Sequence, residues 1–203
     1  DLLAAEWTAY CTSSVKTADA KKLVNKFAWK DLNNLYNHIE KNQPLKIPDS
    51  VKQNSMTDYF MRTRDLEALG YILYAKQVEP YVTGGDGDWE VIKRDSIKMD
   101  RLIKNGRQLY TVAKKDLFKQ KYAYQVLRLA HYSERYTDVI NWYDAYASKT
   151  MANTVLQPMT LALKAGALFR TGKQKEAAYL FSRVFAAGQA KRISHYPGCT
   201  WSV

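Results

Sequence analysis

The chain has 203 residues, of which 46% are hydrophobic and 25% are charged, and its mean hydropathy is −0.46. This length allows one mid-sized domain with a buried core. The composition excludes an intrinsically disordered chain and a polytopic membrane protein. Nine Gly and five Pro are few for a turn-rich β sandwich, and no stretch approaches the 18 consecutive apolar residues of a transmembrane segment.

Charge is distributed unevenly along the chain. Residues 1–100 contain 14 Lys and Arg against 15 Asp and Glu, a net charge of −1, whereas residues 101–203 contain 17 against 5, a net charge of +12. Clustered cations raise the local potential, so a polyanionic ligand or an acidic protein partner fits the basic half. Lys and Arg scattered over solvated helix faces give the same count without any ligand. The composition leaves both interpretations open.

Helical periodicity dominates the N-terminal part. Two short helices are predicted on either side of a break at residues 12–17, and a third begins near Asp31 and stops within residues 42–48. A single helix is then predicted from Ser55 to Glu79. Pro80 is expected to end it, because proline does not continue a helix without strain.

The strongest loop signal is residues 83–88, with three glycines and two aspartates. Asp86, Asp88 and Glu90 invite a calcium-site interpretation. The loop lacks the glycine at position six and the glutamate at position twelve that calcium-binding helix–loop–helix motifs need, so we predict no calcium site. Asp88 is equally well explained as an acidic N-cap of the next helix, a long one over residues 89–117.

The rest of the chain contains an internal repeat, predicted as two helical hairpins over residues 118–150 and 154–187. Equivalent positions are 38 residues apart, as for Tyr136 and Gln174. Small inward residues allow the helices of a hairpin to approach closely, and large ones fill the space towards the next hairpin. The residues expected to face inward are Ala123, Val126, Leu127, Ala130, Tyr136, Val139, Ile140, Tyr143 and Ala147 in the first unit, and Leu161, Ala165, Leu168, Ala177, Phe181, Val184 and Phe185 in the second.

This spacing resembles the tetratricopeptide repeat (TPR). The second unit has the family's small residue, apolar residue, turn glycine, small residue and aromatic at Ala165, Leu168, Gly172, Ala177 and Phe181. The first unit departs from the pattern at Glu134, which stands at the usual glycine. The resemblance implies an all-α, TPR-like α-solenoid: a single domain over residues 1–203, built as a right-handed array of antiparallel hairpins. Two repeats are fewer than normally stand alone, so residues 1–82 are expected to cap the stack, or the tail 188–203 to lead into further repeats.

A more particular resemblance covers about residues 66–201. The segments 122–132, 163–168 and 177–185 resemble a family of large, functionally uncharacterised exported proteins of Bacteroidetes, in which the helical repeats form the N-terminal part of a longer polypeptide. The resemblance implies an exported protein at the periplasm or cell surface and a region that follows residue 203. It implies no activity and no catalytic residues.

TPR-like hairpins bind ligands on the surface formed by the first helix of each pair. The resemblance therefore implies a groove for a protein or peptide, and Arg and aromatic side chains in it suit an extended acidic segment. The alternative is that these side chains pack inside the stack. The predicted groove residues are Lys121, Tyr124, Arg128, His131, Tyr132, Phe169 and Arg170.

No catalytic or metal site is predicted. His38 and His195 have no partners at zinc-ligand spacing, and Cys11 and Cys199 imply no disulfide framework and leave the redox state open. Five acidic residues in the basic half disfavour paired-carboxylate chemistry there. We expect a non-catalytic protein-interaction or assembly module without a cofactor. A basic solenoid that binds nucleic acid or another polyanion is the alternative.

Overall fold

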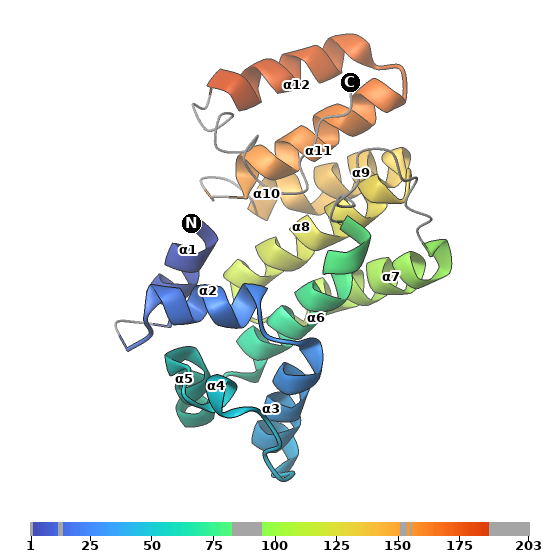
Figure 1. Cartoon of the computed structure of the whole chain (residues 1–203). Coiled ribbons are helices and arrows are strands. Elements are labelled where there is room, and N and C mark those ends of the chain that lie inside the picture. Colours follow the sequence, from blue (N-terminus) through green and yellow to red (C-terminus); the bar gives the residue numbers. More distant parts are fainter. Residues whose placement is uncertain (1, 12–13, 83–94, 151–153, 155, 187–203) are drawn as a thin grey trace, which may run out of the picture. The chain divides into compact units, whose positions relative to one another are not determined.

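The computed structural model describes residues 2–11, 14–82, 95–150, 154 and 156–186 (Figure 1). Every regular element in these ranges is helical, and none is a strand, which confirms the predicted all-α class. No helix in the same ranges is long and apolar enough to cross a bilayer. The chain divides into two compact units, residues 1–77 and 78–203. Each unit is described by itself.

The first unit is built from short helices around an aliphatic and aromatic core. Its helices are α1 (Leu2–Tyr10), α2 (Thr17–Asn25), α3 (Trp29–Lys41), α4 (Asp49–Lys52), α5 (Ser55–Thr63) and the larger part of α6 (Leu66–Val82). The break after α1 and the start of α3 match the predicted periodicity. The core side chains that are almost completely buried include Leu23, Leu32, Leu35, Met56, Phe60, Leu69 and Ile72.

The single helix predicted from Ser55 to Glu79 is wrong. The chain breaks between α5 and α6 at Arg64, whose φ of 53° lies in the left-handed region. The next residue, Asp65, caps α6 by accepting a hydrogen bond from the Ala68 N–H at 3.1 Å. Apolar residues keep their helical spacing through this break, so periodicity alone does not reveal it. Pro80 lies inside the last turn of α6 and does not end the helix before it.

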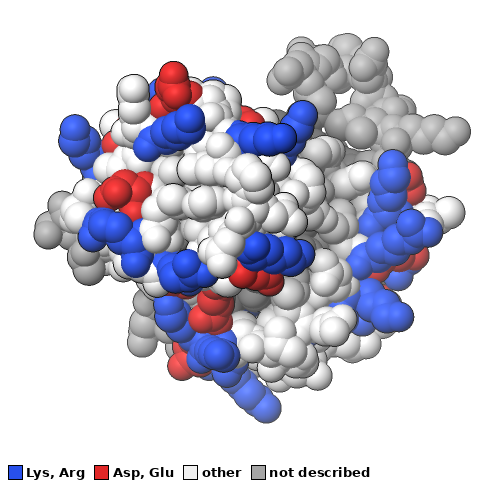
Figure 2. All heavy atoms as spheres, turned by 90° about the horizontal axis from the view of Figure 1, so that it is seen from below, with Lys and Arg blue, Asp and Glu red and all other residues white. Residues whose placement is uncertain are grey.

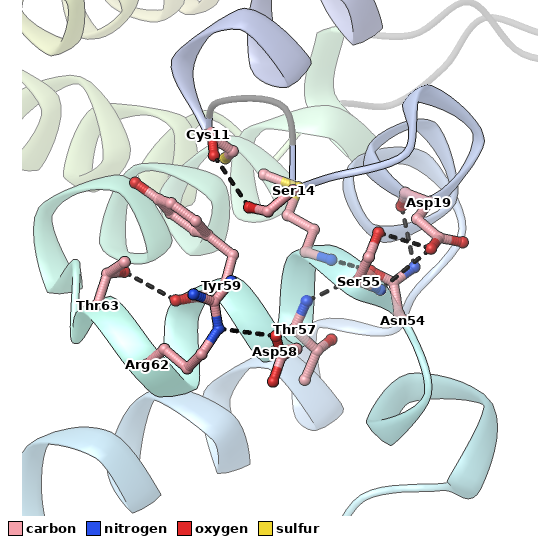
Figure 3. Close-up of polar contacts among 11 residues, drawn as sticks. Cys11, Ser14, Asp19, Asn54, Ser55, Thr57, Asp58, Tyr59, Arg62 and Thr63 are labelled. Atoms are coloured by element: carbon pink, nitrogen blue, oxygen red, sulfur yellow. Dashed lines mark hydrogen bonds and ion pairs between the residues drawn. The ribbon is translucent and has the colours of Figure 1, made fainter.

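A polar cluster joins α2 to the start of α5 (Figure 3). Asn54 caps α5, and its side-chain oxygen accepts from the N–H groups of Met56 at 2.9 Å and Thr57 at 3.3 Å. The Asn54 amide donates to the Asp19 carbonyl at 3.0 Å, and the Asp19 carboxylate accepts from the Ser55 hydroxyl at 2.7 Å. The Ser55 hydrogen bond holds the pKa of Asp19 below its ordinary value. Both the oxygen and the nitrogen of the buried Asn54 side chain therefore have hydrogen-bond partners.

The second unit contains the end of α6 and the helices of the predicted repeat. These are α7 (Ser96–Val112), α8 (Asp116–Tyr132), α9 (Tyr136–Trp142), the π-helical turn η1 (Tyr143–Ala147), α10 (Ser148–Thr150), α11 (Gln157–Arg170) and α12 (Gln174–Ala186). α7 packs along α8, and α11 packs along α12 (Figure 1). α11 also packs against α8 and α9.

Of the helix predicted over residues 89–117, the structure describes α7, Ser96–Val112, while residues 89–94 lie outside the described residues. Asp95 has extended backbone with ψ of 95°, and its carboxylate caps α7 by accepting from the Lys98 N–H at 3.0 Å. The helix therefore begins at Ser96. It ends at Val112, because Ala113 returns to extended backbone with ψ of 134°. The predicted loop 83–88 and the tail 188–203 lie outside the described residues.

Most of the predicted inward residues of the repeat are buried. Ala123, Val126, Leu127 and Ala130 are fully covered on α8, as are Val139, Ala147 and Ala165 elsewhere in the second unit. Phe185 contradicts the prediction: 68% of its surface is exposed. It follows Val184, which occupies the inward position of that turn, so the next side chain is rotated by about 100° towards the surface.

Candidate interaction surface

The turns after α8 and α11 have the same backbone hydrogen bonds. After α8, the Arg135 N–H donates to the Ala130 carbonyl at 2.8 Å. After α11, the Lys173 N–H donates to the Leu168 carbonyl at 2.9 Å. Donor and acceptor are each 38 residues from their counterpart, the period of the sequence repeat. Both turns are closed by the bond from C″ to C3 that defines a Schellman motif.

The match extends to the residues within the turns. Glu134 and Gly172 both have left-handed backbone, with φ of 61° and 82°. The residue before each is a hydroxyl side chain that caps its helix: Ser133 donates to the Leu129 carbonyl at 2.8 Å, and Thr171 donates to the Ala167 carbonyl at 3.0 Å. The sequence repeat is therefore matched by a repeat in the geometry of these turns.

On α8, the predicted groove residues are largely engaged in packing. Lys121 and Tyr124 are buried, with exposed fractions of 2% and 7%. Arg128 is partly buried; it donates to the Val82 carbonyl and to the Gln125 side chain, both at 3.3 Å, and its guanidinium lies 5.4 Å from the centre of the Tyr124 ring. Since α7, α9 and α11 all pack on α8, the structure presents no open groove at Lys121 and Tyr124.

His131 forms part of the contact between α8 and α11. A Cβ atom placed on Gly166 would lie 2.9 Å from the His131 Cε1 atom, so the imidazole fits only because residue 166 has no side chain. The rings of Tyr132 and Tyr136 meet the imidazole edge-on, with centroids 6.1 and 5.5 Å away. His131 and the half-buried Tyr132 are therefore packing residues at the joint between the two helix pairs.

The surroundings of His131 disfavour its protonation. Burial lowers the pKa of the imidazole, and the positive charge of Arg170 lowers it further, while the backbone of Leu163 acts weakly in the opposite direction. Its Nδ1 atom is buried and has no hydrogen-bond partner in the part of the chain that the structure describes. A neutral imidazole is the form that this site accepts.

The helices α11 and α12, here called the second helix pair, present the most exposed aromatic side chains among the described residues of this unit. Of the predicted groove residues, Phe169 is 56% exposed, and Arg170 beside it is also exposed. Sequence reasoning missed two further aromatics on α12, Tyr179 and Phe185, which are 63% and 68% exposed. Tyr179 could have been identified, because it lies two residues after the inward Ala177 and so points away from the core. Phe185 could not, since it continues the apolar period of its helix.

An open depression of about 370 Å³ lies between α11 and α12. Lys164, at one side of it, is already engaged: its Nζ atom lies 2.6 Å from an Asp144 carboxylate oxygen and 4.9 Å from the centre of the Tyr143 ring. The depression is lined by Lys164, Leu168, Lys175, Glu176, Tyr179 and Leu180.

The second helix pair is also strongly basic. Residues 157–186 contain five Lys and Arg and one acidic residue, Glu176. Figure 2 shows one face of the molecule, on which Lys and Arg are interspersed with Asp and Glu and separated by uncharged side chains. Exposed aromatics, an apolar depression and an excess of cations thus coincide on α11 and α12. We take this as the candidate interaction surface.

The residues weighed as metal ligands are not brought together where the structure describes them. No group of three or more His, Cys, Asp or Glu side chains forms a metal-binding arrangement within the described ranges. His38 Nδ1 lies 2.6 Å from the Gln43 carbonyl, and Cys11 is buried. Asp86, Asp88, Glu90, His195 and Cys199 lie outside these ranges.

Comparison with known proteins found no matching family model, no matching curated protein and no matching solved structure.

Proposed function

We propose that this chain is a non-catalytic protein-interaction or assembly module, arranged as a TPR-like array of antiparallel hairpins, and that α11 and α12 form its contact surface. The observation that carries the proposal is the exposure of Phe169, Tyr179 and Phe185 on one helix pair that also contains an apolar depression. Large aromatics contribute most to binding energy where they become buried in an interface. Tyr179 also lines the depression beside Leu168 and Leu180, so exposed aromatic and aliphatic surface adjoin there, which favours contact with another protein.

The repeated turn geometry supports the array. The turns after α8 and α11 are closed by equivalent hydrogen bonds, as expected for successive units of one repeat. In a stacked array, each unit buries its apolar face against its neighbours. The envelope location that the sequence resemblance implies is part of the proposal. Fractionation of the producing cells tests it, and recovery of the protein only from the cytoplasm would contradict it.

The test of the interaction role is the size of the native complex in gently lysed producing cells. We expect the unmodified protein to elute in a complex larger than its own chain, and Tyr179→Ser/Phe185→Ser to elute alone. The matched control is Ile97→Ser/Val112→Ser, since both side chains are 64% exposed on α7 in the same unit. If the α12 variant stays in the complex, or the unmodified protein has no complex, the proposal is wrong.

Polyanion binding is the second candidate, and the excess of cations over residues 157–186 favours it. It requires an affinity for nucleic acid that falls steeply with salt, because Lys and Arg release counterions from phosphates when they bind. Fluorescence anisotropy with oligo-dT and with a DNA duplex at low and physiological salt decides between the two. Tight, salt-sensitive binding to either oligo-dT or the DNA duplex would favour the polyanion candidate.

A further inference from the structure

One face of α12 carries a regular stripe of three side chains. Lys175, Tyr179 and Arg183 stand at i, i+4 and i+8, which places them above one another on the same side of the helix. All three are exposed. At a rise of 1.5 Å per residue, the two cations lie about 12 Å apart along the helix axis, with the tyrosine between them. We call these three residues the α12 stripe.

The α12 stripe borders the depression between α11 and α12, because Lys175 and Tyr179 both line it. Leu168 and Leu180 supply its apolar surface. Its volume, about 370 Å³, is at the lower end of the range for ligand pockets, roughly 300 to 1,000 Å³. An open site of this size suits one or two apolar side chains of a larger partner better than an enclosed small molecule.

The cations of the α12 stripe have no acidic partner in the part of the chain that the structure describes. Lys164 in the same depression is neutralised by Asp144, but neither Lys175 nor Arg183 forms an ion pair there. Glu176 is the only acid in residues 157–186. Lys175 therefore brings an uncompensated charge to the apolar surface of Leu168 and Leu180, and Arg183 carries a second one two helical turns further along the α12 stripe.

We propose that the α12 stripe binds an acidic segment of a partner protein, which inserts an apolar side chain into the depression and places one carboxylate against Lys175 and another against Arg183. This inference rests on the proposed function and specifies its partner. An extended segment advances ~3.3 Å per residue, so carboxylates that reach both cations stand about four residues apart, with the apolar residue between them.

Charge argues against the other occupants of this surface. A second copy of the chain is disfavoured, because its formal net charge is +11 and like charges repel. A phosphate backbone would pair with the cations but would leave the apolar surface of Leu168 and Leu180 without a complement. An acidic segment with an apolar side chain matches both features.

The experiment is a selection of random peptides displayed on phage against the whole 203-residue chain. We expect the enriched peptides to share two acidic residues about four apart that flank Leu, Phe or Trp. Binding of these peptides should weaken about tenfold or more in Lys175→Glu/Arg183→Glu. The control, Lys104→Glu/Lys149→Glu, makes the same change in net charge at exposed positions of the same unit and should leave binding unchanged.

Three outcomes overturn the inference. Enriched peptides could lack an excess of acidic residues, or the two charge-reversal variants could weaken binding equally. Alternatively, oligo-dT could displace the peptides and bind more tightly than any of them, which would favour the polyanion candidate. The two proposals can fail separately. If Tyr179→Ser/Phe185→Ser loses the native complex but either of the first two outcomes is found, the proposed function stands and only the acidic partner is refuted.

Discussion

Glu134 and Gly172 occupy the same place in two turns of the second unit, 38 residues apart, and both have left-handed backbone. Glycine adopts this conformation without steric cost, whereas the Cβ atom of a glutamate strains it. The first helix pair therefore contains a strained turn that the second lacks. The hydrogen bonds of the two turns are otherwise the same, so the strain is local to one residue.

We expect Glu134→Gly to raise the free energy of unfolding by about 0.5–1 kcal/mol, since glycine relieves the strain. Gly172→Ala should lower it by about 1 kcal/mol for the opposite reason. Urea unfolding followed by circular dichroism measures both. Glu134→Ala is the control, because alanine keeps the Cβ atom, and its stability should stay close to that of the unmodified protein. A stabilising effect of Glu134→Ala equal to that of Glu134→Gly would refute strain as the cause.

Gly166→Ala tests the joint between α8 and α11. Its new methyl group would lie 2.9 Å from the His131 Cε1 atom, closer than real Cβ contacts, so the imidazole must move. Overpacking of this kind costs about 1–3 kcal/mol of stability. The cost should largely disappear in a His131→Ala background, which removes the ring. Equal costs in both backgrounds, measured in a double-mutant cycle, would show that the two residues do not touch.

Mild acid should destabilise the second unit through His131. Its pKa in the folded protein lies below the ordinary value of 6.5, so the unfolded chain binds a proton first as the pH falls. The stabilising contribution of the neutral imidazole is therefore complete above pH 6.5 and decreases below it. We expect the free energy of unfolding to fall as the pH decreases below about 6.5, with a shallower slope in His131→Gln. Identical slopes for both proteins would contradict the packing described for His131.

Asn54→Ala should weaken the first unit. The substitution removes the acceptor for the N–H groups of Met56 and Thr57 and the donor to the Asp19 carbonyl. Loss of an N-cap costs about 1–2 kcal/mol. Asn54→Ser keeps an acceptor oxygen and should retain most of the stability. Thermal unfolding of the two variants compares them, and equal losses would mean that capping does not account for the role of Asn54.

Sequence patterns predicted those parts of the fold that depend on hydrophobic periodicity and turn chemistry. Ala123, Val126, Leu127 and Ala130 are buried as expected, and Gly172 has positive φ at the expected turn. Helix breaks inside an apolar period were missed. Arg64 takes a left-handed conformation that its residue type does not signal, and Asp95 caps α7 inside a stretch whose spacing suits a continuing helix.

The candidate surface was only partly foreseen, for a similar reason. Phe169 and Arg170, two of the predicted groove residues, are exposed. For Lys121 and Tyr124 the sequence left a groove and packing inside the stack as alternatives, because a helical wheel shows one helix without its neighbours, and both side chains are buried. Burial on α8 depends on how several helices pack around it, which is tertiary information. The exposure of Phe185 likewise follows from the rotation of α12 and not from its composition.

Site-specific photo-crosslinking tests the central claim most directly. A photoreactive phenylalanine derivative is placed at position 179 on α12 or at position 112 on α7, where the native side chains have similar exposure. After illumination of the producing cells, we predict one defined protein adduct from position 179 and none of the same mass from position 112. Adducts of equal yield from both positions, or no protein adduct from position 179, would contradict a contact surface on α12.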